Sequence, residues 1–180
     1  MATFGVIISC IIGFTVGTLC FQNKNSASFM LGVCDIFQTF PSFVYLIPVM
    51  MLFGITDTSV LIAVIVYATI PATRYTIEGL RSVPTALHDA ATMSGVTKFQ
   101  RLFKIEFPLA FPHMMLGLNQ TIVFALFMVI IGAFIGTEDL GQYILKALSD
   151  KNGAGIGLTL GICVASVSYT HLTLPTILRV

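Results

Sequence analysis

The residues best suited to a specific interaction form a spaced pattern in one polar segment, which lies between two long apolar runs. The pattern consists of an acidic residue, two alanines, a glycine, an isoleucine and a proline, at Asp89, Ala90, Ala91, Gly95, Ile105 and Pro108. Six constrained positions at usages of roughly one in fifteen give about one chance match in ten million registers. Small alanines let another protein surface approach closely, and a carboxylate beside them offers a charged contact. The segment therefore predicts a docking site for a second protein.

A short helix is expected to carry the first half of this pattern. Pro84 suits the first turn of a helix, which would run through Leu87, Ala90, Ala91 and Ser94. Gly95 then permits a sharp change of direction, because glycine tolerates backbone conformations that other residues avoid. The sequence thus predicts that the chain turns at Gly95.

A second short helix is predicted over residues 98–106. Thr97 followed by Gln100 is the pattern of a capping box at its start, and Pro108 is expected to stop it. Basic side chains on this helix would give charged contacts at its edge, at Lys98, Arg101 and Lys104. Two helices at an angle would make a docking knob. The alternative is an ordinary amphipathic loop lying on lipid headgroups, which would not require this spacing.

Metal, cofactor and nucleic-acid chemistry are not indicated. The four cysteines lie in or beside apolar stretches, without the Cys/His spacing of a metal site; they are Cys10, Cys20, Cys34 and Cys163. A net charge of +1 and the lack of a basic block with interleaved aromatic residues give no reason to expect nucleic acid. We read the cysteines as small hydrophobic residues packed in helices.

The composition indicates an all-α membrane protein. The 180 residues are 56% hydrophobic and 9% charged, with a mean hydropathy of +0.95, whereas soluble domains carry roughly 25% charged residues. A spanning helix needs about 20 mainly apolar residues. Five such runs are predicted, at about 3–21, 36–54, 57–73, 112–135 and 153–170. We read the first as a membrane helix rather than a signal peptide, because no charged segment precedes it.

Basic residues predict the orientation of these spans. Most lie in the connection 74–111 and one, Lys24, lies in the first connection, whereas the second connection has none and the fourth has Lys146 and Lys151. Connections rich in Lys and Arg are cytoplasmic. The N-terminus is thus expected outside, and the C-terminus and the docking knob inside.

Two sets of polar or kink-forming residues are candidates for lining a transport pathway. The second span has a stripe at helical spacing, formed by Gln38, Pro41, Tyr45, Pro48 and Leu52. Its prolines bend a helix and leave carbonyls unpaired, which membranes tolerate where neighbours or water satisfy them. A kinked packing face is an equally good interpretation. In the fourth span, the amides of Asn119 and Gln120 should face other helices or a cavity.

The segment 89–108 resembles the cytoplasmic coupling loop of permease subunits of bacterial ATP-binding cassette (ABC) importers, with Asp89 in place of Glu and Phe107 in place of Leu. Residues 35–54, Asn119 to Thr121 and Ile135 to Gly141 are similar to permeases for glycine betaine, proline betaine, choline and carnitine. The resemblance covers most of residues 5–165. It implies a five-transmembrane-helix permease core of a bacterial plasma-membrane importer.

This resemblance also implies partners. These are a separate ATPase subunit that receives the coupling loop, an extracytoplasmic substrate-binding protein, and a second permease copy. The chain itself has no Gly-x-x-x-x-Gly-Lys-Ser/Thr motif and is expected not to be an enzyme. A quaternary ammonium substrate has no donor hydrogens and favours aromatic faces, so Phe40, Phe43 and Tyr45 are candidate contacts.

Two other functions remain open. A permease for methionine or another small solute would use the same core, whereas a secondary transporter would need coupling charges within the membrane. Residues 1–168 are predicted to form the permease domain. The segment 169–180 resembles translated sequencing adapter, and we expect it to be a non-native tail; the N-terminus likewise suggests a start partway into the first helix.

Overall fold

The computed structural model describes residues 2–134 without interruption and, beyond them, only isolated positions, which are Gly136, Gln142, Lys146, Ser149 and Gly161. The predicted fifth span and the predicted tail therefore lie outside the described residues. Within the described part, three helices are long and apolar enough to cross a membrane, and one bent helix pair passes the same test together.

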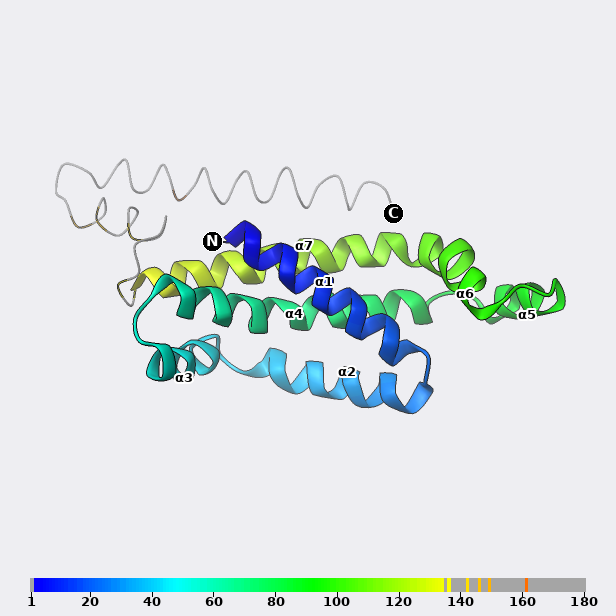
Figure 1. The fold of residues 1–180 in the computed structure, drawn as a ribbon, viewed down its shortest axis with the longest axis horizontal. Coiled ribbons are helices and arrows are strands. Elements are labelled where there is room, and N and C mark those ends of the chain that lie inside the picture. Colours follow the sequence, from blue (N-terminus) through cyan, green and yellow to red (C-terminus); the bar gives the residue numbers. More distant parts are fainter. Residues whose placement is uncertain are drawn as a thin grey trace.

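The three long helices are α1 (Ala2–Phe21), α4 (Asp57–Arg81) and α7 (Phe107–Phe134). α4 and α7 run side by side, and α1 crosses them at an angle (Figure 1). Glycines on α1 allow this close crossing. A Cβ added to Gly13 would lie 2.4 Å from the Ala72 Cβ, and one added to Gly17 would lie 2.7 Å from the Thr76 Cβ. Such small-residue contacts let membrane helices approach closely without a hydrophobic driving force.

The predicted second span, 36–54, is wrong as a single helix. The chain instead forms α2 (Lys24–Thr39) and α3 (Phe43–Phe53), which are bent by 84° relative to each other. Pro41 explains the break: proline disfavours helical dihedrals in the residue before it, and Phe40 is extended, with φ −73° and ψ 136°. α3 has 11 residues, about 16 Å at 1.5 Å per residue, which is too short to cross a membrane alone.

A tight connection joins α3 to α4, as expected from the two residues that separate the predicted spans 36–54 and 57–73. Gly54 adopts a positive φ of 78° after the end of α3, a conformation that favours glycine. Thr56 then caps α4, and its side chain accepts a hydrogen bond from the Ser59 backbone N–H. The two helices therefore form the expected hairpin.

α4 continues two turns beyond the predicted end of the third span at residue 73. Arg74 and Arg81, predicted in a loop, lie inside the helix. Partners on α2 and α4 explain how Arg74 is accommodated: its guanidinium donates to Asp35 at 2.5 Å and to Glu78 at 3.0 Å. Arg81 donates to the Lys24 carbonyl at 3.0 Å. These contacts hold α2 along α4.

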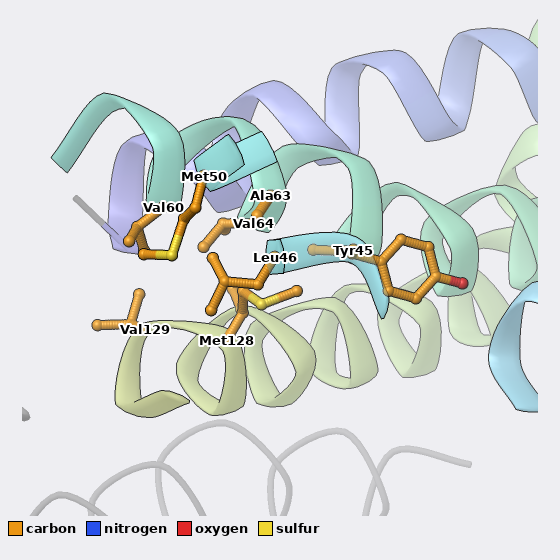
Figure 2. Close-up of a cluster of buried hydrophobic side chains, with 10 residues drawn as sticks. Tyr45, Leu46, Met50, Val60, Ala63, Val64, Met128 and Val129 are labelled. Atoms are coloured by element: carbon orange, nitrogen blue, oxygen red, sulfur yellow. The ribbon is translucent and has the colours of Figure 1, made fainter. Parts of the chain in front are cut away.

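The bent α3 is held by a hydrophobic cluster with α4 and α7, shown in Figure 2. Its buried members are Tyr45, Leu46, Met50, Val60, Ala63, Val64, Ala68, Ala125, Met128 and Val129. The Tyr45 ring lies at the edge of this cluster, and its hydroxyl points away from it (Figure 2) to donate to the Phe37 carbonyl on α2. One side chain thus joins both sides of the bend.

Candidate functional site

The docking knob comprises α5 (Thr85–Met93), α6 (Lys98–Arg101) and the π-helix η1 (Leu102–Glu106). It lies at one end of the helix bundle, and α3 lies at the other (Figure 1). The capping box predicted for the second helix is confirmed: Thr97 accepts from the Gln100 backbone N–H, and the Gln100 side chain accepts from the Thr97 N–H. The predicted start of the second helix is therefore correct.

Gly95 makes the turn between the two helices. Its φ is +71°, in the left-handed region, and its backbone N–H donates to the Thr92 carbonyl at 3.1 Å. Residues other than glycine, with some tolerance for asparagine and aspartate, occupy this region at a cost. The direction of α6 relative to α5 thus depends on residue 95.

The predicted end of the second helix at Pro108 is wrong. α6, η1 and α7 join into one helix of 35 residues, Lys98–Gly132. In η1 the hydrogen bonds run to the fifth preceding residue, as in the bond from the Phe107 N–H to the Leu102 carbonyl, and this shifts the register by one residue. Pro108 lies inside this continuous helix, two residues after η1, where the regular hydrogen-bond pattern is already interrupted. The knob is thereby continuous with a membrane-spanning helix.

The remaining pattern residues are distributed over both faces of the knob. Asp89 and Ala90 are exposed, whereas Ala91 is only 4% exposed. Ile105 is half-buried and Pro108 is exposed. Of the two alanines, only Ala90 can therefore meet another protein, while Ala91 packs within the chain.

A buried carboxylate at the centre of the knob was not predicted from the sequence. Glu106 is 2% exposed, and its Oε1 accepts from the Arg101 Nε at 2.8 Å. The same oxygen lies 3.0 Å from the Nδ1 of His88 on α5. Arg101, expected as an edge contact, instead turns toward Glu106. A signal was available in Glu106 itself, an acidic residue between the apolar Ile105 and Phe107, but its partner His88 lies on another helix.

The predicted pathway stripe does not form one helix face, because the bend at Pro41 separates Gln38 from the rest. Gln38 is half-buried, and its Oε1 accepts from Arg74 at 3.0 Å. Tyr45 is buried, whereas Pro41 and Pro48 are exposed. These residues therefore surround a bend instead of following a straight groove.

The amides of the fourth predicted span lie in the middle of α7. Asn119 and Gln120 are both half-buried. The Asn119 Oδ1 is buried, and it has no hydrogen-bond partner in the part of the chain that the structure describes. The sequence thus located these polar groups at depth in a spanning helix.

Comparison with solved structures identifies the class of protein. A chain of the MetNI methionine ABC transporter in an inward facing conformation matches with a TM-score of 0.79 at 20% identity, over 94% of this chain and 85% of that one. The chain thus has the all-α fold of an ABC importer permease. Residues 5–178 match the family described as binding-protein-dependent transport system inner membrane component, and the chain belongs to this family.

Relatives within the family transport small methylated amines according to their names. The chain is 87% identical over 174 residues to the trimethylamine N-oxide transport system permease protein TmoV of Pelagibacter ubique, covering 96% of this chain. It is 34% identical over 169 residues to the glycine betaine transport system permease protein OpuAB of Bacillus subtilis, covering 93% of this chain and 60% of that protein. The chain spans only 24% of the length of the TmoV relative. The resemblance to quaternary-amine permeases is confirmed. Trimethylamine N-oxide, in the name of the TmoV relative, is not among the substrates that the resemblance implies.

Proposed function

We propose that the chain is the membrane-spanning part of an ATP-driven, binding-protein-dependent importer of small methylated amines, with trimethylamine N-oxide as the first candidate substrate. The observation that carries this proposal is the 87% identity to a trimethylamine N-oxide permease across 96% of the chain. Glycine betaine, proline betaine, choline and carnitine share the methylated nitrogen and are the second candidates. The chain itself carries out transport, and a separate subunit hydrolyses ATP.

An aromatic array at the bend supports a pathway for such substrates. Ring centroids follow one another at 6.2 Å from Phe40 to Phe37, 6.2 Å to Tyr45, 5.1 Å to Tyr67 and 4.7 Å to Phe124. A methylated nitrogen offers no hydrogen-bond donor but is attracted to aromatic faces. We infer that substrate passes this array, with the exposed Phe40 ring as its first contact.

The other residues proposed to line the pathway lie at the bend or on α7. Gln38, Pro41 and Pro48 flank the bend, and Tyr45 lies inside it. The amides of Asn119 and Gln120 offer polar contacts to the oxygen of an N-oxide or a carboxylate. Phe43 is 47% exposed and is available beside Phe40.

The docking knob would bind to the ATPase subunit. Exposed apolar side chains lie on the same elements of the knob, at Leu87, Met93, Phe99 and Phe103. Such a patch on a protruding element is typical of a protein interface. ATP-driven closure of the motor would move the knob and switch the pathway between inward- and outward-facing states. The binding protein would approach the opposite end of the bundle, and a second permease copy would complete the pathway.

Competition for uptake tests the substrate class. The importer, reconstituted with its ATPase and binding protein, is expected to take up labelled trimethylamine N-oxide, and excess glycine betaine or choline should compete better than methionine. The likeness to the methionine transporter, at 20% identity, supports the fold alone. Competition by methionine only would favour the alternative small-solute permease.

The proposed topology can be tested by thiol labelling. With the native cysteines removed, a cysteine at Lys24 or Lys98 should react with impermeant reagents only from the cytosolic side. A cysteine at Lys151, which lies outside the described residues, should react only from outside. The position of the α3–α4 turn at the opposite end from the knob (Figure 1) fits this orientation. Labelling of Lys98→Cys from outside would contradict the importer proposal.

A further inference from the structure

The first helix of the docking knob has little support from its neighbours. α5 packs along no other helix in the described part of the chain and protrudes from the end of the bundle (Figure 1). Only three residues, Ser82 to Pro84, separate it from α4, and Gly95 lies in the turn that follows it. Both connections are short backbone segments, which fix the position of α5 more than its angle.

Among the described residues, one ion-pair contact joins α5 to the rest of the knob, in addition to the burial of Ala91. The His88 Nδ1 lies 3.0 Å from the Glu106 Oε1, and either the neutral Nδ1–H tautomer or the charged imidazole can donate to a carboxylate. Glu106 is 2% exposed, so its charge needs partners at this site. Arg101 provides the second partner from the preceding turn of the same helix, at 2.8 Å.

Glu106 belongs to the 35-residue helix that includes α7. Its carboxylate is therefore attached to a membrane-spanning helix, while His88 belongs to the helix proposed to contact the ATPase. Arg101 and Glu106 lie on one helix and cannot fix its angle to another, whereas the pair of His88 and Glu106 can. The contact is a charged side-chain link between α5 and the helix that continues into α7.

We propose that Glu106 is a positioning residue that holds α5 at a fixed angle to α7 through His88, so that motion of the ATPase reaches α7 directly. This proposal rests on the proposed role of the knob as the ATPase contact. It assigns the transmission of motion to α7, because the His88–Glu106 contact ends on the helix that includes α7, in addition to the short backbone connection. Loss of the link should leave the ATPase able to bind and hydrolyse ATP, but with less substrate moved per ATP.

A distance measurement tests the angle independently of transport. Spin labels at Thr92 on α5 and Phe111 on α7, both exposed, report the orientation of the two helices in the assembled permease. A narrow distance distribution is expected with the native link, and a distribution at least twice as wide in His88→Ala and in Glu106→Gln. His88→Ala leaves the Arg101 pair intact, so it remains informative if Glu106→Gln fails to fold.

Glu78→Gln is the matched control. It makes the same chemical change in a glutamate that also pairs with an arginine, at 3.0 Å from Arg74, but that lies on α4 and is more exposed. The distance distribution of this variant should equal that of the unmodified protein. Unchanged distributions in both His88→Ala and Glu106→Gln would overturn the proposal.

The second readout is the amount of substrate taken up per ATP hydrolysed in the reconstituted importer. We expect this ratio to fall about tenfold in His88→Ala and Glu106→Gln, and to stay unchanged in Glu78→Gln. A wider distance distribution with an unchanged ratio would also overturn the transmission role. If the unmodified importer takes up no methylated amine, the proposed function fails, but the distance measurement still decides whether Glu106 fixes the angle.

Discussion

The Gly95→Val permease is expected to insert into the membrane normally and to transport nothing measurable. Residue 95 has a φ of +71°, where an L-residue costs about 1–2 kcal/mol and a β-branched side chain is a genuine outlier. Among the described residues, no neighbouring atom lies within 4 Å of the added Cβ, so the backbone conformation, not crowding, is responsible. Relaxation of the turn would redirect α6 relative to α5. The two helices of the docking knob would then no longer present their exposed side chains together.

The control for this variant is Gly95→Asn, because asparagine visits the left-handed region more readily than other side chains. Uptake by the reconstituted importer and the amount of permease in the membrane are measured together. Gly95→Asn should keep a substantial part of the uptake, and Gly95→Val should lose it at equal membrane content. Full uptake by Gly95→Val would show that the geometry of the knob does not matter for transport.

The Gly13→Leu variant should lose the packing of α1 on α4. A Cβ at this position would lie 2.4 Å from the Ala72 Cβ and 3.0 Å from the Thr73 backbone nitrogen. Backbone atoms cannot move aside as a flexible side chain can, so the helices must separate. Overpacking costs typically about 1–3 kcal/mol, and a leucine meeting backbone should reach the upper part of that range or exceed it.

Native Cys10 reports this separation. It is buried, with 8% exposure, in the same helix. In detergent-solubilised protein, a maleimide should label Cys10 much faster in Gly13→Leu than in the native chain, when Cys20, Cys34 and Cys163 are replaced by alanine. Gly32→Leu is the control, because no atom of the part of the chain that the structure describes lies within 4 Å of a Cβ there. Equal labelling rates in Gly13→Leu and Gly32→Leu would contradict the tight crossing.

Apolar length and turn chemistry explain what could be predicted from the sequence. The long helices α1, α4 and α7 follow from uninterrupted apolar runs, and the knob follows from local signals at Thr97, Gln100 and Gly95. These features depend on residues close together in the chain. They needed no knowledge of tertiary contacts.

The errors have tertiary causes. The second predicted span is continuous because its prolines indicate a kink within one helix, not the 84° break that α3 maintains by packing on α4 and α7. The third predicted span ends at residue 73, but Asp35 and Glu78 accept hydrogen bonds from Arg74 and the helix continues. The link between His88 and Glu106 joins residues on different helices, which neither periodicity nor spacing reveals.

The most direct test of the proposed function measures uptake of labelled trimethylamine N-oxide by proteoliposomes that contain the importer, its ATPase and its binding protein. Uptake is predicted only when ATP is available to the ATPase and the binding protein is present on the opposite side. An ATPase that binds but cannot hydrolyse ATP should reduce uptake to background. Uptake that continues without ATP and follows an ion gradient would contradict the account and identify a secondary transporter.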